Sequence, residues 1–413
     1  MRVVLTPRST ICVLVVLMTM GLFGLAHPVF AQTGKDPVIS NLRVGQHPDK
    51  VRLVLDMSND LSFTIFQLPD PYRIVLDLPQ VSFELPKTAR TRSVGSVAGW
   101  RYGLFEPGTS RLVIDAKAPL KVAAAFVLPP SGEQGHRLVL DLAPTDRDEF
   151  IVASAASIER RMANRTPRVT PTPSPNPPAV PGDNRRVVAI DPGHGGVDPG
   201  AIGLSKVYEK DLVLKVAKAL KAELESRGGY KVVLTRESDV YIQLRERIAI
   251  ARRAGAEMFI SLHADSIDDT SLRGLSVYTL SENASDEEAA SLATSENKSD
   301  IIAGMDFSTE EPVVTDILID LAQRRTMNLS TRLANTVVEE MGPRVRLLNR
   351  PRRSAGFAVL KAPDVPSILV ELGFLSNSQD EKTLRDATKR EQLATGLADS
   401  IDRFFLGMQS ARR

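Results

Sequence analysis

A proline-rich stretch divides this chain, and no other feature limits its possible folds as strongly. It begins Thr-Pro-Arg-Val-Thr-Pro-Thr-Pro-Ser-Pro-Asn-Pro-Pro at residue 166 and ends near Pro181. Because proline lacks a backbone N–H and favours the extended polyproline conformation, the stretch predicts a semi-rigid linker without a core. A helical pattern precedes it, so we assign a helix and linker to residues 145–184. The 413 residues suffice for a separate domain on each side.

The first 31 residues have the pattern of a cleaved secretory signal peptide, residues 1–31. Arg2 and Arg8 precede an apolar stretch, and Val29-Phe-Ala31 offers the small side chains that a signal peptidase recognises. The apolar stretch is short for a membrane span. No Arg-Arg pair precedes it, which favours the general secretion route. We therefore expect a secreted protein that is not held in a membrane after cleavage.

Removal of this signal leaves a chain without net charge or cysteine. Residues 1–31 contain two arginines and no acidic residue, so their loss lowers the formal charge from +2 to zero. A neutral protein offers no electrostatic basis for binding nucleic acid. Cys12 is the only cysteine and is lost with the signal, which excludes disulfides in the mature protein.

Residues 36–144 alternate apolar and polar side chains, as half-buried strands do. One five-residue phrase recurs, with Arg first, three aliphatic residues next and Asp last. Residues i, i+2 and i+4 share one face of a strand, so each phrase places its Arg and its Asp on the same face. Turn-rich connections between the phrases predict a compact all-β sandwich. The four phrases are Arg52–Asp56, Arg73–Asp77, Arg111–Asp115 and Arg137–Asp141.

The Arg and Asp side chains of these phrases allow two interpretations. In the first, they form ion pairs across neighbouring strands on a solvated face. In the second, they form a polar surface that binds a carbohydrate polymer. The histidines of this region, His47 and His136, stand alone, so the sequence predicts no metal site here.

From residue 185 to residue 408, predicted strands alternate with predicted helices. This order is typical of an α/β domain whose central sheet is mostly parallel and is flanked by helices. Ligands of such open sheets bind at the carboxyl ends of the strands. The predicted strands are 187–191, 231–235, 258–263, 274–280, 345–348, 357–360 and 367–372, and the predicted helices are 209–227, 244–254, 313–341 and 388–406.

Two histidines of this domain each come at or just after the end of a predicted buried strand. His194 lies in Asp-Pro-Gly-His-Gly-Gly, where the glycines leave space for a close approach to the imidazole. His263 closes the run Met-Phe-Ile-Ser-Leu-His. Since both follow parallel strands, we expect the two rings to meet at one edge of the sheet. The alternative for each ring is a structural hydrogen bond within its own loop.

Two acids complete the candidate site. Glu209 opens a predicted helix, a position where an acid also favours the helix dipole. Glu371 interrupts the otherwise apolar run 366–374, and a buried carboxylate is costly unless it is paired or bound to metal. Two imidazoles and one carboxylate suit Zn²⁺ as ligands. Glu371 at a strand end suits a general base that activates water.

These side chains lie in four sequence blocks that occur together in one known family. The blocks are Asp-Pro-Gly-His-Gly-Gly-Val-Asp-Pro-Gly from 191, Glu209, Ser-Leu-His-Ala-Asp from 261 and Pro-Ser-Ile-Leu-Val-Glu-Leu-Gly-Phe-Leu-Ser-Asn from 366. In kind and order they resemble the zinc-dependent N-acetylmuramoyl-L-alanine amidases. Less specifically, the β-rich region at 36–144 resembles the AMIN domain that accompanies these amidases.

The resemblance implies a function and a role for each residue. His194, Glu209 and His263 would bind Zn²⁺, and Glu371 would be the catalytic glutamate. The substrate would be peptidoglycan, cleaved at the amide between the lactyl group of N-acetylmuramic acid and L-alanine. An AMIN domain implies binding to peptidoglycan, and the division enzymes of the family imply a periplasmic protein that acts in daughter-cell separation.

An acidic insertion occupies about residues 281–327. Between Ser281 and Asp320 there are eleven acidic residues and one basic residue, Lys298. Ser285-Asp-Glu-Glu288 has the spacing of a capping box, which predicts a helix start. The resemblance implies that this helix covers the zinc until a LytM-type activator protein displaces it. Glu288 is our candidate for the acid that occupies the water position on the zinc, with Glu282 and Glu287 as alternative candidates. The other interpretation of Glu288 is that it serves only as a helix cap.

Three functions compete at this point. The first is an autoinhibited zinc-dependent amidase that acts on peptidoglycan. The second is a zinc peptidase that acts on other peptides, because the same chemistry hydrolyses either amide. The third is a non-catalytic scaffold that binds peptidoglycan. Glu371 argues against the scaffold, because an idle domain would have no need of a costly buried acid.

Overall fold

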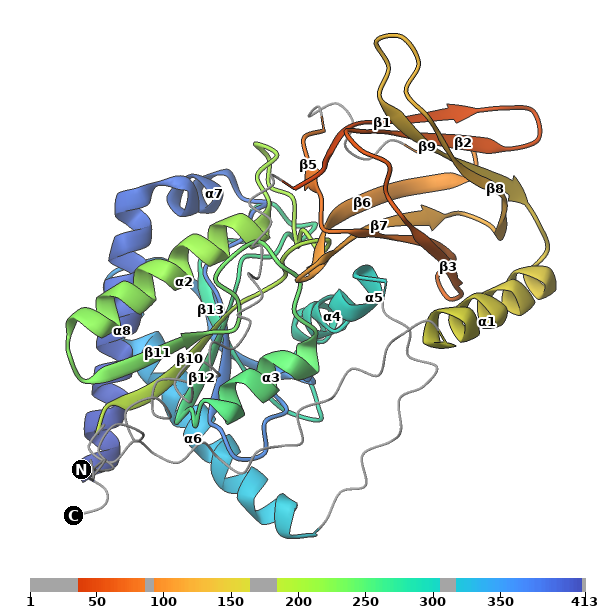
Figure 1. The fold of residues 1–413 in the computed structure, drawn as a ribbon. Helices are drawn as coiled ribbons and strands as arrows, with labels where there is room; N and C mark the ends of the chain where they lie inside the picture. The colour runs from red at the N-terminus through yellow and green to blue at the C-terminus, as the bar shows by residue number, and fades with distance from the viewer. Residues whose placement is uncertain (1–35, 86–92, 164–183, 305–316, 411–413) are drawn as a thin grey trace, which may run out of the picture. The chain divides into compact units, whose positions relative to one another are not determined.

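The computed structural model describes residues 36–85, 93–163, 184–304 and 317–410, and Figure 1 shows their elements as a ribbon. The predicted signal peptide and residues 164–183 of the predicted linker lie outside these ranges, so both assignments stay predictions. None of the helices described in these ranges is both long and apolar enough to cross a membrane.

The N-terminal region is a sandwich of two mainly antiparallel sheets, as the sequence predicts. Their strand orders are β5-β1-β2-β9-β8 and β3-β4-β7-β6. The alternating aliphatic side chains of both sheets face inward and form one core, in which Leu53, Leu76, Ile114 and Leu140 are fully buried. The strands are β1 (Val38–Gln46), β2 (Val51–Met57), β3 (Thr64–Leu68), β4 (Arg73–Pro79), β5 (Ser82–Phe83), β6 (Val97–Glu106), β7 (Thr109–Ala116), β8 (Leu120–Leu128) and β9 (His136–Pro144).

The four repeated phrases lie on β2, β4, β7 and β9, two in each sheet. Arg52 is paired in register with Asp141, and Arg111 with Asp77; each ion pair has an N···O distance of 2.6 Å. Cross-strand ion pairing is therefore confirmed for these two pairs. The expectation of a solvated face is wrong for Arg111, whose side chain is completely buried. Helix α1 (Arg147–Ala163) follows the sandwich and packs on β3.

The C-terminal region contains a six-stranded sheet in the order β11-β10-β12-β15-β13-β14. All neighbouring strands are parallel except β13 and β15, which confirms a mostly parallel α/β sheet. The near-continuous apolar runs predict strands covered on both faces, and every residue of β12 and β15 is buried. The strands are β10 (Arg186–Pro192), β11 (Tyr230–Leu234), β12 (Met258–His263), β13 (Leu275–Leu280), β14 (Leu347–Ala355) and β15 (Ser367–Glu371).

Helices cover both faces of this sheet (Figure 1). Helices α2 (Glu209–Ser226), α6 (Ile317–Met341) and α8 (Ala387–Ser410) bury the face that carries Ile190, Ile260 and Ile368. The alternate residues of the same strands pack against α3 (Leu244–Arg253), α4 (Glu287–Glu296) and the short 3₁₀ helix η2 (Ala358–Leu360).

Two expectations for this domain need correction. Residues 357–360 were predicted as a strand but lie at the 3₁₀ helix η2, because a short apolar run does not distinguish a strand from a buried helical turn. Helix α7 (Ser378–Arg385) was not predicted, although the Asn377 side chain caps it by accepting from the N–H groups of Gln379 and Asp380.

The acidic insertion forms two short helices, α4 and α5 (Ser299–Ile302), before residues 305–316, which lie outside the described ranges. Helix α4 begins one residue later than the capping-box spacing predicts. Its cap is Asp286, whose side chain accepts a hydrogen bond from the Ala289 N–H.

Candidate active site

The sheet brings the predicted site residues to one edge. Strands β10, β12 and β15 are adjacent and parallel, so their carboxyl ends meet there. His263 and Glu371 are register partners at the ends of β12 and β15. The rings of His194 and His263 approach edge to face, with their centroids 4.9 Å apart. Glu209, the first residue of α2, is completely buried beside them.

Four side chains, those of His194, His263, Glu209 and Glu296, lie within a few ångströms of one another at this edge. Glu209 lies 3.2 Å from His194 Nε2 through Oε2 and 3.1 Å from His263 Nδ1 through Oε1. Glu296 Oε2 lies 3.1 Å from the same His263 nitrogen and 3.5 Å from His194 Nε2. Within the described residues, His194, His263 and Glu296 offer ligand atoms that all lie within 4.8 Å of one another. This set of two imidazoles and two carboxylates is one that zinc proteins use.

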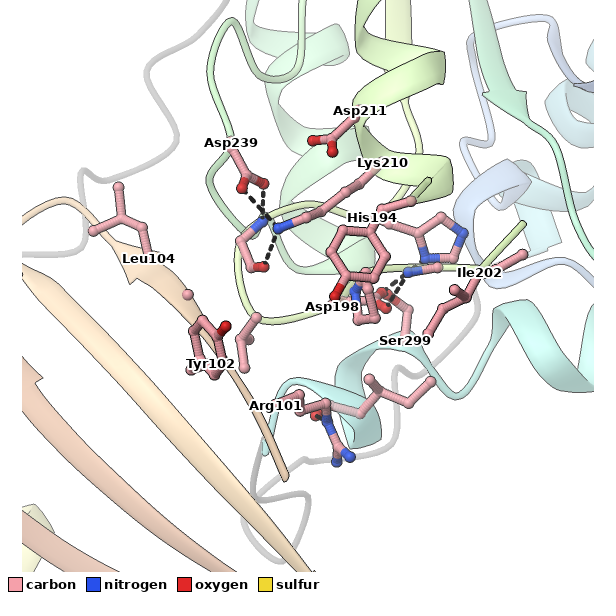
Figure 2. A pocket seen from close by; sticks show the side chains of 18 of the residues that line it. Arg101, Tyr102, Leu104, His194, Asp198, Ile202, Lys210, Asp211, Asp239 and Ser299 are labelled. Atoms are coloured by element: carbon pink, nitrogen blue, oxygen red, sulfur yellow. Dashed lines mark hydrogen bonds and ion pairs between the residues drawn. The ribbon is translucent and has the colours of Figure 1, made fainter. Parts of the chain in front are cut away.

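Asp198 fixes the orientation of His194. Its Oδ2 lies 2.9 Å from His194 Nδ1, and the two side chains face each other in Figure 2. The opposite ring nitrogen, Nε2, is buried and has no hydrogen-bond partner among the described residues. A carboxylate on one ring nitrogen and a free second nitrogen is the arrangement of metal-binding histidines. The orphaned Nε2 therefore fits a bound metal ion.

The charges of the cluster also fit a cation. Burial would lower the pKa of His263, but Glu296 and Glu209 raise it to about 10. Burial likewise opposes protonation of His194, yet Glu209 and Asp198 raise its pKa well above the usual value. Both rings thus sit in a strongly negative field. A divalent ion would balance this field without requiring protonated imidazoles.

Two buried arginines shape the loop that carries His194, and sequence reasoning missed both. His194 has a φ of 58°, a left-handed conformation that needs support from its surroundings. Arg247 donates to the carbonyls of Pro192 and His194 at 2.9 and 2.8 Å and forms an ion pair with Asp191. Arg236 donates to the Gly193 carbonyl at 2.8 Å. Their sequence signal is weak, because a helix or strand-end arginine usually lies in solvent.

The glycines around His194 are required by close approach. A Cβ atom on Gly193 would lie 2.4 Å from Cε1 of His263. A Cβ atom on Gly200, which has a φ of +64°, would lie 2.6 Å from Glu209 Oε2. The sequence interpretation that glycine leaves space at this site is therefore confirmed. The groups that need the space are the His263 ring beside Gly193 and the Glu209 carboxylate beside Gly200.

Glu371 stands next to the cluster as a buried acid with one free oxygen. Its Oε2 accepts a hydrogen bond of 3.0 Å from the Asp265 N–H. Its Oε1 is buried without a hydrogen-bond partner among the described residues. Burial raises the pKa of Glu371 well above its usual value; His263 opposes this, and Glu209 adds to it. The raised proton affinity makes the ionised carboxylate a stronger base than a solvated glutamate.

The acid from the insertion is Glu296 and not Glu288. Glu288 is largely exposed and lies 2.6 Å from Arg353, so the structure corrects our choice. Glu296 closes α4 and shares its buried face with Ala289, Leu292 and Ala293. The spacing 289, 292, 293, 296 is that of one helix face. This pattern was the available signal, because Glu296 is the acid that continues the apolar stripe.

A cleft of about 710 Å³ borders the cluster. Its walls include His194, Asp198 and Glu296 from the C-terminal region and Trp100 and Tyr102 from β6 of the sandwich. Figure 2 shows Tyr102 and Leu104 on the β6 side of this cleft and Lys210 and Asp239 on the α2 side. The cleft therefore lies directly beside the candidate metal ligands.

An α/β sheet with a candidate metal centre and a buried carboxylate at its carboxyl edge defines a hydrolase-like site. Residues 188–403 match the family model for N-acetylmuramoyl-L-alanine amidase, and residues 55–142 match the AMIN domain. The chain therefore belongs to the N-acetylmuramoyl-L-alanine amidase family and carries an N-terminal AMIN domain.

Relatives support this membership along nearly the whole chain. N-acetylmuramoyl-L-alanine amidase AmiC of Neisseria meningitidis is 36% identical over 384 residues, which cover 91% of each chain. AmiC of Escherichia coli O6:H1 is 33% identical and covers 90% of this chain and 91% of its own. AmiA of Escherichia coli K12 is 37% identical over 55% of this chain and 79% of its own.

Proposed function

We propose that this protein is a zinc-dependent N-acetylmuramoyl-L-alanine amidase that cleaves the amide between the lactyl group of N-acetylmuramic acid and L-alanine. Peptidoglycan is the substrate that the family implies. The observation that carries the proposal is the buried Glu371 carboxylate, placed in register with His263 at the edge where His194 and Glu209 also meet.

Each residue of the site has a role in this reaction. His194 through Nε2, His263 through Nδ1 and Glu209 would hold Zn²⁺, which when bound polarises the scissile carbonyl and increases the acidity of water. Asp198 keeps the His194 ring in the required tautomer. Glu371 takes a proton from the attacking water and delivers it to the departing L-alanine amine as the C–N bond breaks. No covalent intermediate with the protein is required.

The protein is autoinhibited in this proposal. Glu296 occupies the fourth position of the cluster, where water and the substrate carbonyl need access. Amidase activity then requires that α4 moves away. The family resemblance suggests a LytM-type activator as the partner that displaces it. It also suggests a role in daughter-cell separation in the periplasm, which the protein would reach by means of the signal in residues 1–31.

Product analysis tests the reaction. Full-length protein is loaded with Zn²⁺ and incubated with purified sacculi, and a variant that lacks residues 282–325 is treated in parallel. We expect stem peptides with a free L-alanine amine and bare glycan, released faster by the deletion variant. Cuts within the stem peptides would indicate a zinc peptidase instead. A folded deletion variant that binds zinc and releases nothing would indicate a non-catalytic scaffold.

A further inference from the structure

The insertion that carries Glu296 ends against the AMIN sandwich. Residues 301–304 form the end of α5 and the turn after it, where a helix leaves its last carbonyls without a full set of intrahelical donors. Among them, the Ile301 carbonyl accepts one backbone hydrogen bond, from the Gly304 N–H at 3.0 Å. Three arginines of the sheet β3-β4-β7-β6 donate to these carbonyls. We call Arg73, Arg101 and Arg111 the arginine clamp.

Each carbonyl in the run receives a donor from the clamp. Arg73, on β4, donates to Ile301 O. Arg101, on β6, donates through Nε to Ile302 O at 2.6 Å. Arg111, on β7, donates through Nη1 to the carbonyls of residues 303 and 304 at 3.0 and 2.9 Å. Four consecutive carbonyls thus accept hydrogen bonds from three adjacent strands, and charged donors make such bonds stronger than neutral ones.

The clamp is held in place by the sandwich itself. Arg111 is completely buried, and Asp77 accepts from its Nε and Nη2 at 2.6 and 2.8 Å. Its guanidinium carbon lies 3.5 Å from the centroid of the Phe105 ring. Arg101 is fixed by an ion pair with Asp115. Donors that are already oriented lose little entropy on binding, so the sheet is a prepared surface for the segment.

The segment fits this surface closely. Ala303 is fully buried in a cluster with Val75 and Val113. Gly304 has a φ of +71°, and a Cβ atom there would lie 3.2 Å from side-chain carbons of the same two valines. A larger side chain at residue 304 would therefore separate the segment from the sheet.

The same segment is tied to the metal cluster. Ser299 donates to Asp198, the residue that orients His194, and Tyr241 donates to Asp300. Only a few residues separate Glu296, at the end of α4, from the clamped carbonyls. The segment is thus hydrogen-bonded both beside the metal cluster and at the AMIN sheet.

We propose that the AMIN sheet β3-β4-β7-β6 is an internal binding site for residues 301–304 and stabilises the blocked state of the active site. This inference rests on the proposed blocking role of Glu296. The AMIN domain thereby acts as a regulatory part of the enzyme. Whatever separates it from the segment raises the amidase activity.

The test uses zinc-loaded full-length protein with one change on each side of the contact. Arg101→Gln removes a partly exposed donor from the sheet, and Gly304→Val forces the segment away from it. Arg52→Gln is the matched control: it breaks a similar cross-strand pair, with Asp141, in the other sheet of the sandwich. Hydrolysis of dye-labelled sacculi is measured without activator, and hydrogen exchange is measured for the peptide 297–304.

We expect both test variants to exchange faster at 297–304 and to hydrolyse sacculi about fivefold faster, the effect of one net hydrogen bond on the docked fraction. The control should match the wild type in both. Unchanged exchange in both variants, with unchanged melting temperatures, would overturn the clamp. Faster exchange with an unchanged rate would show that the sheet binds the segment, but it would overturn the control of activity by the AMIN sheet and, with it, the blocking role of Glu296.

Discussion

Two glutamates reach the candidate metal site by different routes. Glu371 ends β15 in the middle of the central sheet, paired with β12 and β13 on either side. Glu296 is the last residue of the ten-residue helix α4, which lies outside the sheet. Its position depends on the packing of α4 against one face of the sheet, on local hydrogen bonds and on the carbonyls that the AMIN sheet binds. Both carboxylates are buried, but only one belongs to the core that holds the domain together.

In the proposed function, this difference separates the acid that acts on water, Glu371, from the acid that blocks the site, Glu296. Moving Glu371 would require opening a sheet whose strands are buried on both faces. Moving Glu296 requires α4 to leave its packing on one face of the sheet and to lose a few hydrogen bonds, but it leaves the strands paired. Changes in the sheet should therefore abolish activity, and changes in the segment should increase it. The following predictions test this opposition.

The largest effect is expected at Glu371. Glu371→Gln keeps the shape of the side chain but removes the proton acceptor, so hydrolysis of sacculi should fall by about 10²- to 10⁴-fold. Zinc content, measured by elemental analysis, should stay at the wild-type level. Glu257→Gln, which removes a surface acid paired with Arg186, is the control and should leave the rate unchanged. A Glu371→Gln variant with wild-type rate would refute the role of this residue as base.

A smaller loss is expected when the orientation of His194 is weakened. Asp198→Asn removes the carboxylate that faces His194 Nδ1, and such changes typically lower metal affinity by about 10- to 100-fold. Competition with a chromogenic zinc chelator measures this affinity independently of turnover. Wild-type affinity in the folded variant would show that the tautomer of His194 does not depend on Asp198.

An increase is expected from the insertion. Glu296→Gln removes the charge that faces His263 and His194, and activity without activator should rise about tenfold, as for the loss of one charged hydrogen bond. Glu288→Gln lies on the same helix and loses only its contact with Arg353, so its rate should not change. If Glu288→Gln activates and Glu296→Gln does not, the blocking acid has been wrongly identified.

The smallest effect on activity and stability is expected for a change in the other sheet of the sandwich, β5-β1-β2-β9-β8, for which no contact with residues 301–304 is described. Arg52→Gln breaks a pair with Asp141 in which Arg52 is more than one-third exposed. Asp141 is almost fully buried, but Lys50 lies 2.9 Å from its Oδ2 and still pairs with it in the variant, so urea unfolding should change little. The rate on sacculi should also stay constant. A marked activation by Arg52→Gln would mean that the whole sandwich, and not one of its sheets, controls the segment.

Short segments of the sequence predict most of the residues that meet at the carboxyl edge of the central sheet. A carboxylate inside an apolar run predicts Glu371, since a buried charge needs a partner or a function. Histidines at the ends of buried runs predict that His194 and His263 meet, because parallel strands end at one edge. The four Arg-to-Asp phrases predict a sandwich with cross-strand pairs. These inferences succeed because strand periodicity and burial are properties of short segments.

The tertiary structure alone decides where the buried face of α4 is placed and what each arginine contacts. Glu288 and Glu296 lie on different faces of α4, and the packing of this helix places one beside Arg353 and the other beside His263. Likewise, Arg52 and Arg111 begin nearly identical phrases, yet only Arg111 meets the end of the insertion. A phrase of five residues determines the face on which an arginine lies. The partner opposite that face comes from a segment almost two hundred residues away, and only folding brings it there.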